Sequence, residues 1–206
     1  MEDRPAGSVS AFILAGGKST RMGRDKAFLE FGGQTLLARA LVLARSASSD
    51  VRIVGGAEKF SRFATVVEDE FRGRGPLSGI HAALRSSKTD LNLILAVDMP
   101  LVSTSFLEYL TAEARKSPNL LAVVPRTGGR NQTLCAIYRR GFFEPAERSL
   151  RAGENRIDCL FAPGTVRLID EEELRRAGFS EDIFRNLNTP AEVESANISL
   201  HEGAQR

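Results

Sequence analysis

The sequence predicts an α/β protein: a three-layer α/β/α sandwich around a Rossmann-like, mostly parallel sheet. Two observations carry this prediction. Short apolar runs alternate along the chain with segments of helical periodicity, which is typical of parallel strands joined by crossover helices. The runs at residues 9–15 (VSAFILA) and 91–97 (LNLILAV) are apolar at nearly every position, as expected of strands that are buried on both faces.

The expected elements follow one another in a regular order. A glycine pair closes the first strand (residues 9–15), and Leu36, Ala40 and Leu43 form an apolar stripe on the first helix (residues 34–44). Pro76 opens a later helix, because a proline at the first helical position loses no hydrogen bond. Pro100 ends the strand at residues 91–97, because proline cannot donate to a sheet. The other expected strands cover residues 51–54, 64–68, 121–125, 133–138 and 166–169; the other helices cover residues 104–116, two short stretches after residue 138, a segment starting at 171–173, and one beginning at Pro190.

Length and composition limit the class of protein. The 206 residues, 42% of them hydrophobic, suit one domain spanning residues 1–206, with frayed tails at 1–8 and 197–206. Its 28 basic and 26 acidic side chains nearly cancel, which argues against nucleic-acid binding. We see no apolar run of bilayer length and no signal-peptide pattern, so we expect a cytoplasmic protein without membrane contact. Cys135 and Cys159 are expected to be reduced thiols in the core.

Several glycines and carboxylates directly follow predicted strands. They are Gly16-Gly17, Gly55-Gly56, Asp69 and Asp98. In open parallel sheets, ligands bind beyond the carboxyl ends of the strands. The sequence therefore predicts that these residues gather along one rim.

The most informative segment is the glycine loop at residues 14–26 (LAGGKSTRMGRDK). Its three glycines let backbone N–H groups approach an anion, and Lys18, Arg21, Arg24 and Lys26 add four cations. A P-loop would need glycine at Phe12, and a dinucleotide fingerprint would need G-x-G-x-x-G. An ordinary glycine turn with solvated charges is the alternative, and the density of cations favours a polyphosphate site.

Five motifs together resemble the molybdenum cofactor guanylyltransferase family, within the nucleotidyltransferases. They are LAGGKSTRMGRDK, VEDEFRGRGPLSGIHAAL, LAVDMPLV, QTLCAIYRR and FRNLNTPAE, in the family's order from about Val9 to Glu192. The resemblance implies the nucleotide-diphospho-sugar transferase fold. It also implies transfer of GMP from GTP to molybdopterin, with Mg²⁺ as cofactor and release of pyrophosphate.

The same resemblance implies roles for individual residues. Lys26, Arg21 and Asp98 match catalytic positions, and Asp98 also matches the Mg²⁺ ligand. The nucleotide-binding positions, besides Lys26 and Asp98, are Leu14, Ala15, Gly16, Gly17 and Asp69, and the acceptor-side positions are Asn186 and Asn188. The expected partners are GTP and molybdopterin, with transient contacts to cofactor-biosynthesis or molybdoenzyme maturation proteins, and the protein is expected to be a monomer.

Some alternatives stay open on the sequence alone. The family often has asparagine after the second strand, where this chain has Gly55-Gly56, so a cytidylyltransferase or a sugar-phosphate nucleotidyltransferase is a rival. A catalytically silent nucleotide-binding module is another, which the presence of both Lys26 and Asp98 argues against. Asp98 alone is also compatible with a turn former before proline, and the run at residues 68–70 with solvated surface.

Overall fold

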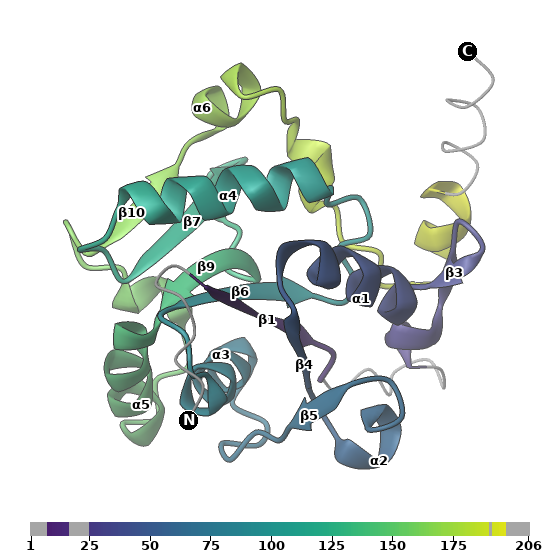
Figure 1. Cartoon of the computed structure of the whole chain (residues 1–206), viewed down its shortest axis with the longest axis horizontal. Coiled ribbons are helices and arrows are strands. Elements are labelled where there is room, and N and C mark those ends of the chain that lie inside the picture. The colour runs from purple at the N-terminus through teal and green to yellow at the C-terminus, as the bar shows by residue number, and fades with distance from the viewer. Residues whose placement is uncertain (1–7, 17–24, 190, 197–206) are drawn as a thin grey trace.

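The computed structural model describes residues 8–16, 25–189 and 191–196. Within these ranges the main sheet has eight strands in the order β10-β7-β9-β6-β1-β4-β5, with β8 paired to β7 (Figure 1). The strands are β1 (Val9–Leu14), β4 (Asp50–Val54), β5 (Thr65–Val67), β6 (Leu91–Ala96), β7 (Ala122–Thr127), β8 (Arg130–Asn131), β9 (Cys135–Arg139) and β10 (Val166–Ile169).

Helices cover both faces of this sheet, as the sequence predicts for a three-layer sandwich. Helices α1 and α4 lie on one face, and α3 and α5 lie on the other (Figure 1). The helices are α1 (Leu36–Ala47), α2 (Ala57–Phe60), α3 (Pro76–Ser86), α4 (Thr104–Lys116), α5 (Phe143–Arg151) and α6 (Glu171–Arg176). The expected fold class is therefore confirmed.

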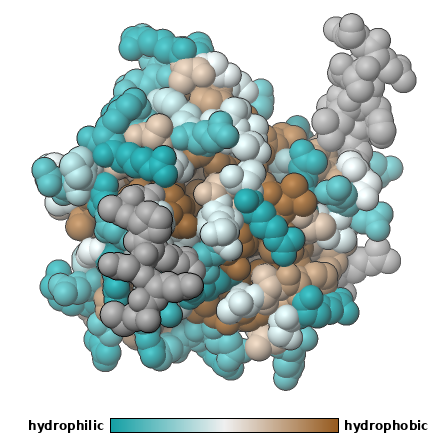
Figure 2. All heavy atoms as spheres, in the orientation of Figure 1, coloured by the Kyte–Doolittle hydropathy of each residue, from teal (hydrophilic) through white to brown (hydrophobic). Residues whose placement is uncertain are grey.

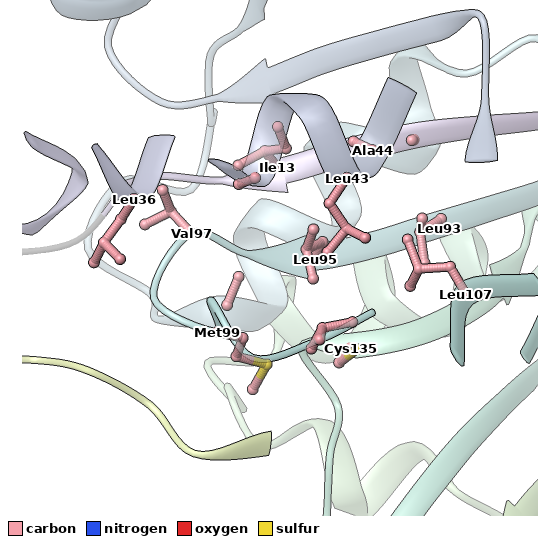
Figure 3. Close-up of a cluster of buried hydrophobic side chains, with 14 of the residues drawn as sticks. Ile13, Leu36, Leu43, Ala44, Leu93, Leu95, Val97, Met99, Leu107 and Cys135 are labelled. Carbon is pink, nitrogen blue, oxygen red and sulfur yellow. The ribbon is translucent and has the colours of Figure 1, made fainter. Parts of the chain in front are cut away.

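Each face of the sheet has its own buried cluster. On the first face, Leu43 of α1 and Leu107 of α4 pack toward Leu93 and Leu95 of β6 (Figure 3). On the second, Phe12 and Ile94 meet α3 and α5. Strands β1 and β6 thus bury side chains on both faces, which explains why their sequences are almost continuously apolar.

The expectation of parallel pairing holds for four strand pairs of the main sheet and fails for the pairs that β9 and β8 make. Pairs β1–β4, β1–β6, β4–β5 and β7–β10 are parallel, whereas β9 is antiparallel to both β6 and β7. A parallel connection needs a crossover of a dozen or more residues, and the segment between β7 and β9 is too short to supply one. Gly128 and Gly129, both with positive φ, instead form a tight turn from β7 into β8.

Three small elements were missed by the sequence prediction. The hairpin of β2 (Glu30–Phe31) and β3 (Gln34–Thr35) turns at Gly32-Gly33, both with positive φ. This hairpin moves the start of α1 from residue 34 to Leu36, where Thr35 caps the helix by accepting from Ala38 N. The others are the short helix α2 and strand β8. Pro190 lies outside the described residues, and residues 191–196 are helical.

The outer surface of this sandwich is mixed in polarity. Figure 2 shows hydrophilic side chains around most of the rim of one face of the molecule and hydrophobic ones toward its centre. Val42, on the outer side of α1, is the most exposed large hydrophobic residue among those described. No helix in the described ranges has the length and apolar character needed to cross a membrane.

Candidate active site

A pocket of about 900 Å³ opens at the carboxyl ends of β1, β4, β5 and β6. It includes Gly16 after β1, Gly55 after β4, Asp69 after β5 and Asp98 after β6. The sheet rule thus correctly predicted the gathering of these four residues along one rim. The pocket is completed by the segment before α3 and by single residues from distant parts of the chain: Lys26, Leu134 and Asn186.

Lys26 and Asp98 meet at one end of this pocket. Lys26 Nζ donates to Asp98 Oδ2 over 2.5 Å, although 72 residues separate them in the chain. Lys26 begins a 3₁₀ helix (Lys26–Phe28), whose cap Asp25 accepts from Ala27 N over 3.1 Å. Asp98 is only 4% exposed, so its carboxylate is shielded from bulk water and the ion pair is stronger than a surface pair.

The loop that carries Asp98 is fixed from two sides. The backbone carbonyl of Asp98 accepts from Leu187 N over 2.9 Å, which ties the segment at residues 186–188 to the loop. On the other side, Arg39 Nε of α1 donates to Pro100 O over 2.6 Å, while its guanidinium lies over the Phe31 ring. Arg39 was not singled out from the sequence, because its partner is a backbone carbonyl 61 residues away.

The start of the glycine loop is anchored to the neighbouring strand. Ala15 N and Gly16 N both lie within hydrogen-bond distance of Val54 O, at 3.1 and 3.2 Å. Leu14, Ala15 and Gly16, which the resemblance implied as nucleotide-binding residues, all line the pocket. The predicted site residues Gly17 and Arg21, and the neighbouring Lys18 and Arg24, lie outside the described residues.

The structure gives a steric reason for glycine at position 55. A Cβ atom built there would lie 2.9 Å from two ring atoms of Phe60, closer than real Cβ contacts allow. Phe60 is itself 1% exposed and stacks on Phe28, with ring centroids 6.0 Å apart. The aromatic ring of Phe60 therefore occupies the space that a side chain at position 55 would need. Only backbone groups of Gly55 can face a ligand.

We expect Gly55→Ala to lower the free energy of unfolding by about 1–3 kcal/mol, because the buried Phe60 ring must shift to admit the methyl group. The matched control is Gly56→Ala, since a Cβ at Gly56 meets nothing within 4 Å. Urea unfolding of both variants measures the difference. Equal stabilities of the two variants would contradict the steric explanation.

The loop between β5 and α3 carries two carboxylates into the pocket, Glu68 and Asp69. Asp69 Oδ1 accepts from Phe71 N over 2.8 Å and so shapes the loop. Glu68 Oε1 accepts from Ala57 N over 3.2 Å, at the start of α2. From the sequence, only Asp69 was predicted as a site residue. Glu68 belongs to a charge run that is typical of solvated surface, and its position one residue after β5 was the available signal.

The ring of His81 packs against this loop. Its ring, 1% exposed, lies edge-on to Phe71 of the loop (5.1 Å) and stacks on Phe143 of α5 (4.8 Å). Neither ring nitrogen has a hydrogen-bond partner among the described residues. Burial therefore lowers the pKa of His81, against the opposing influence of Glu147, Glu70 and Asp69, while Arg85 adds to the lowering.

The stability of the protein should consequently fall in acid through His81. Because its pKa is lower in the folded than in the unfolded chain, the unfolded chain takes up this proton first as the pH drops below the ordinary value of 6.5. The stabilisation is complete above that value and is lost as the pH falls toward the folded-state pKa. We expect the loss of Tm between about pH 7.5 and about pH 5.5 to be smaller in His81→Phe than in the natural chain. Equal losses would show that His81 does not contribute.

The two asparagines predicted on the acceptor side separate in the structure. Asn186 lines the pocket. Asn188 does not, and its backbone N–H donates to Glu192 Oε2 over 2.6 Å, at the start of the helical residues 191–196. Of this pair, the structure brings only Asn186 to the site.

The expectation that both cysteines lie in the core is right for Cys135 and wrong for Cys159. Cys135 on β9 is buried, and its burial raises its pKa to about 12. Cys159 is exposed. It lies on a 3₁₀ helix (Ile157–Leu160) that buries only Ile157, so the apolar residues around it did not indicate a buried position.

The donor set at Asp98 fits one mode of metal binding. No three His, Cys, Asp or Glu side chains gather as ligands in the described ranges, which argues there against an all-protein cage. Mg²⁺, however, usually keeps several waters and binds one or two carboxylates together with substrate phosphates. Asp98 lines the pocket, and its carboxylate has two oxygens, of which Lys26 contacts one. The site therefore suits a magnesium ion that arrives with a polyphosphate.

Comparison with known proteins identifies the family of the chain. The model of the MobA-like NTP transferase domain matches residues 11–168, about three quarters of the chain. The chain belongs to this family. A relative from Pelotomaculum thermopropionicum, named probable molybdenum cofactor guanylyltransferase, is 36% identical and covers 92% of each chain. Family membership makes the protein a nucleotidyltransferase.

Solved structures show the same fold. Molybdopterin-guanine dinucleotide biosynthesis protein A from Archaeoglobus fulgidus matches with a TM-score of 0.80 at 28% identity, covering 94% of this chain and 99% of that one. A 2-C-methyl-D-erythritol 4-phosphate cytidylyltransferase from Thermus thermophilus matches with a TM-score of 0.67 at 21% identity, covering 94% of this chain and 99% of that one. At that identity the second likeness shows the fold alone. Both support the nucleotide-diphospho-sugar transferase fold that the sequence motifs implied.

Proposed function

We propose that the protein transfers GMP from GTP to molybdopterin, forming the guanine dinucleotide cofactor and releasing pyrophosphate. One observation carries the proposal: a buried carboxylate and a lysine, distant in sequence, pair at one end of a pocket in a chain similar throughout to molybdenum cofactor guanylyltransferases. The substrates are GTP and molybdopterin, and we place the reaction in the cytoplasm, where nucleoside triphosphates are available.

The chemistry requires positioning and charge stabilisation more than proton transfer. An oxygen of the acceptor's phosphate attacks the α-phosphorus of GTP, and the bond from that phosphorus to the leaving pyrophosphate breaks in line. The acceptor phosphate is already largely ionised, so no strong general base is needed. Lys26 offers its ammonium group to the phosphate oxygens as negative charge accumulates on the leaving group.

Asp98 serves this step in two ways. Its ion pair with Lys26 holds the ammonium group at the pocket, so that little reorganisation is needed when the nucleotide binds. Its carboxylate would also hold Mg²⁺, which supplies charge neutralisation and orientation of the triphosphate when bound. The backbone at Gly16 borders the same end of the pocket. We assign Lys26 and Asp98 as catalytic residues, and Leu14, Ala15, Gly16 and Asp69 as nucleotide-binding residues.

The assignment is tested by incubating the protein with molybdopterin, molybdate, Mg²⁺ and each of GTP, CTP, ATP and UTP in turn. We expect mass analysis to show a guanine dinucleotide product, with pyrophosphate released mainly in the GTP reaction. A cytosine product would replace the proposal with a cytidylyltransferase. Release of no pyrophosphate with any nucleotide would point to a silent binding module.

A further inference from the structure

The order of the strands gives the spacing between the residues that line the pocket at their carboxyl ends. Strands β6, β1, β4 and β5 are neighbours in this order, and their carboxyl ends carry Asp98, Gly16, Gly55 and Glu68 respectively. Neighbouring strands lie about 4.8 Å apart, so β6 and β5 are separated by about 14 Å. This separation is comparable to the length of an extended nucleotide.

The two ends of this row differ in charge. Lys26 lies at the β6 end, beside Asp98, and offers a cation to phosphates. Glu68 lies at the β5 end, where its carboxylate accepts hydrogen bonds and pairs with Arg72; Lys59 of α2 also lines the pocket, so charge alone does not set the direction of a bound nucleotide. With its phosphates at Lys26 and Asp98, as the proposed function requires, a nucleoside triphosphate in this pocket places its base near β4 and β5.

At the β4–β5 end, Glu68 lines the pocket with a carboxylate that can accept hydrogen bonds from a base. Gly55 and Gly56 contribute backbone groups only, and Phe60 fills the space beside Gly55. Asp69 Oδ1 accepts from Phe71 N within its own loop, whereas the Glu68 contact reaches across to the start of α2. The Glu68 carboxylate is held in front of Gly55-Gly56 by Ala57 N at 3.2 Å, with Arg72 Nη2 at 3.6 Å from its second oxygen.

We infer that Glu68 determines the specificity for guanine by accepting hydrogen bonds from its N1–H and 2-amino groups. A carboxylate has two acceptor oxygens with about four lone-pair sites, so it can accept from Ala57 N and from a base together. Guanine presents two adjacent donors on its Watson–Crick edge. Cytosine and adenine present a single amino group beside an acceptor nitrogen, which would face the carboxylate unfavourably. The side chain of Glu68 thereby recognises the base at a place where Gly55 and Gly56 offer only backbone groups.

This inference rests on the proposed function, and its test separates the two. Binding of GTP and of inosine triphosphate, which lacks the 2-amino group, is measured by calorimetry in the presence of Mg²⁺. For the natural chain we expect GTP to bind about 10- to 100-fold more tightly, the range for a hydrogen bond to a charged group. In Glu68→Gln we expect this preference to fall to about 3-fold or less, because the neutral amide has one acceptor oxygen and adds a donor.

Two further variants make the result specific to this residue. Glu70→Gln is the matched control, because Glu70 lies two residues away, pairs with Arg85 and does not line the pocket; its preference should equal that of the natural chain. Glu58→Gln tests the other glutamate that lines the pocket. An unchanged preference in Glu68→Gln, or a loss in Glu58→Gln instead, would overturn the inference while leaving GMP transfer intact. If the natural chain transfers no nucleotide at all, the proposed function is wrong, whatever the binding preference of Glu68→Gln.

Discussion

Replacing Lys26 by alanine should lower nucleotide turnover by about 100- to 1,000-fold, the cost typical of removing one preorganised group that stabilises the transition state. Lys26 Nζ pairs directly with Asp98 at the phosphate end of the pocket, and its position is fixed by the short helix that it begins. We expect the fold to be retained, because Lys26 is partly exposed at the rim and the two hydrophobic clusters are untouched. Pyrophosphate release measures turnover, and far-UV circular dichroism checks the fold.

A matched control for this variant is Lys116→Ala. Lys116 also pairs with a glutamate, Glu113, over 2.7 Å, but it lies on α4 outside the pocket. We expect its turnover to equal that of the natural chain. Normal GMP transfer by Lys26→Ala would remove this lysine from the mechanism.

Asp98→Ala should reduce activity by several orders of magnitude, and added Mg²⁺ should restore little of it. The variant loses the carboxylate that would hold the metal and also the partner that holds Lys26 in place. Asp98→Asn is the milder change, since the amide keeps the shape and one acceptor oxygen but carries no charge. We expect it to be nearly as inactive, because a neutral amide is a weak ligand for Mg²⁺.

The control for Asp98 lies at the other end of the same strand. Asp90 precedes β6 and pairs with Arg139, away from the pocket, so Asp90→Asn repeats the loss of charge without touching the site. Activities are compared over a titration of Mg²⁺. Recovery of Asp98→Ala at high Mg²⁺ would show that other groups hold the metal.

Much of the fold was predictable because its strongest elements are local patterns. Strand β6 is apolar at nearly every position, and α3 begins at the predicted Pro76. The rule that ligands bind beyond the carboxyl ends of parallel strands then placed Gly16, Gly55, Asp69 and Asp98 together. The reversal of β9 was missed because apolar alternation does not report strand direction.

By itself, the sequence determined that Gly16, Gly55, Asp69 and Asp98 lie at one edge of the sheet, because strand periodicity and glycine turns are properties of neighbouring residues. The tertiary structure decided which residues touch. Lys26 reaches Asp98 across 72 residues, Arg39 binds the carbonyl of Pro100, and Phe60 excludes a side chain at Gly55. Such contacts depend on how separate helices and strands pack against one another, and no local pattern encodes the distance between two atoms on different elements.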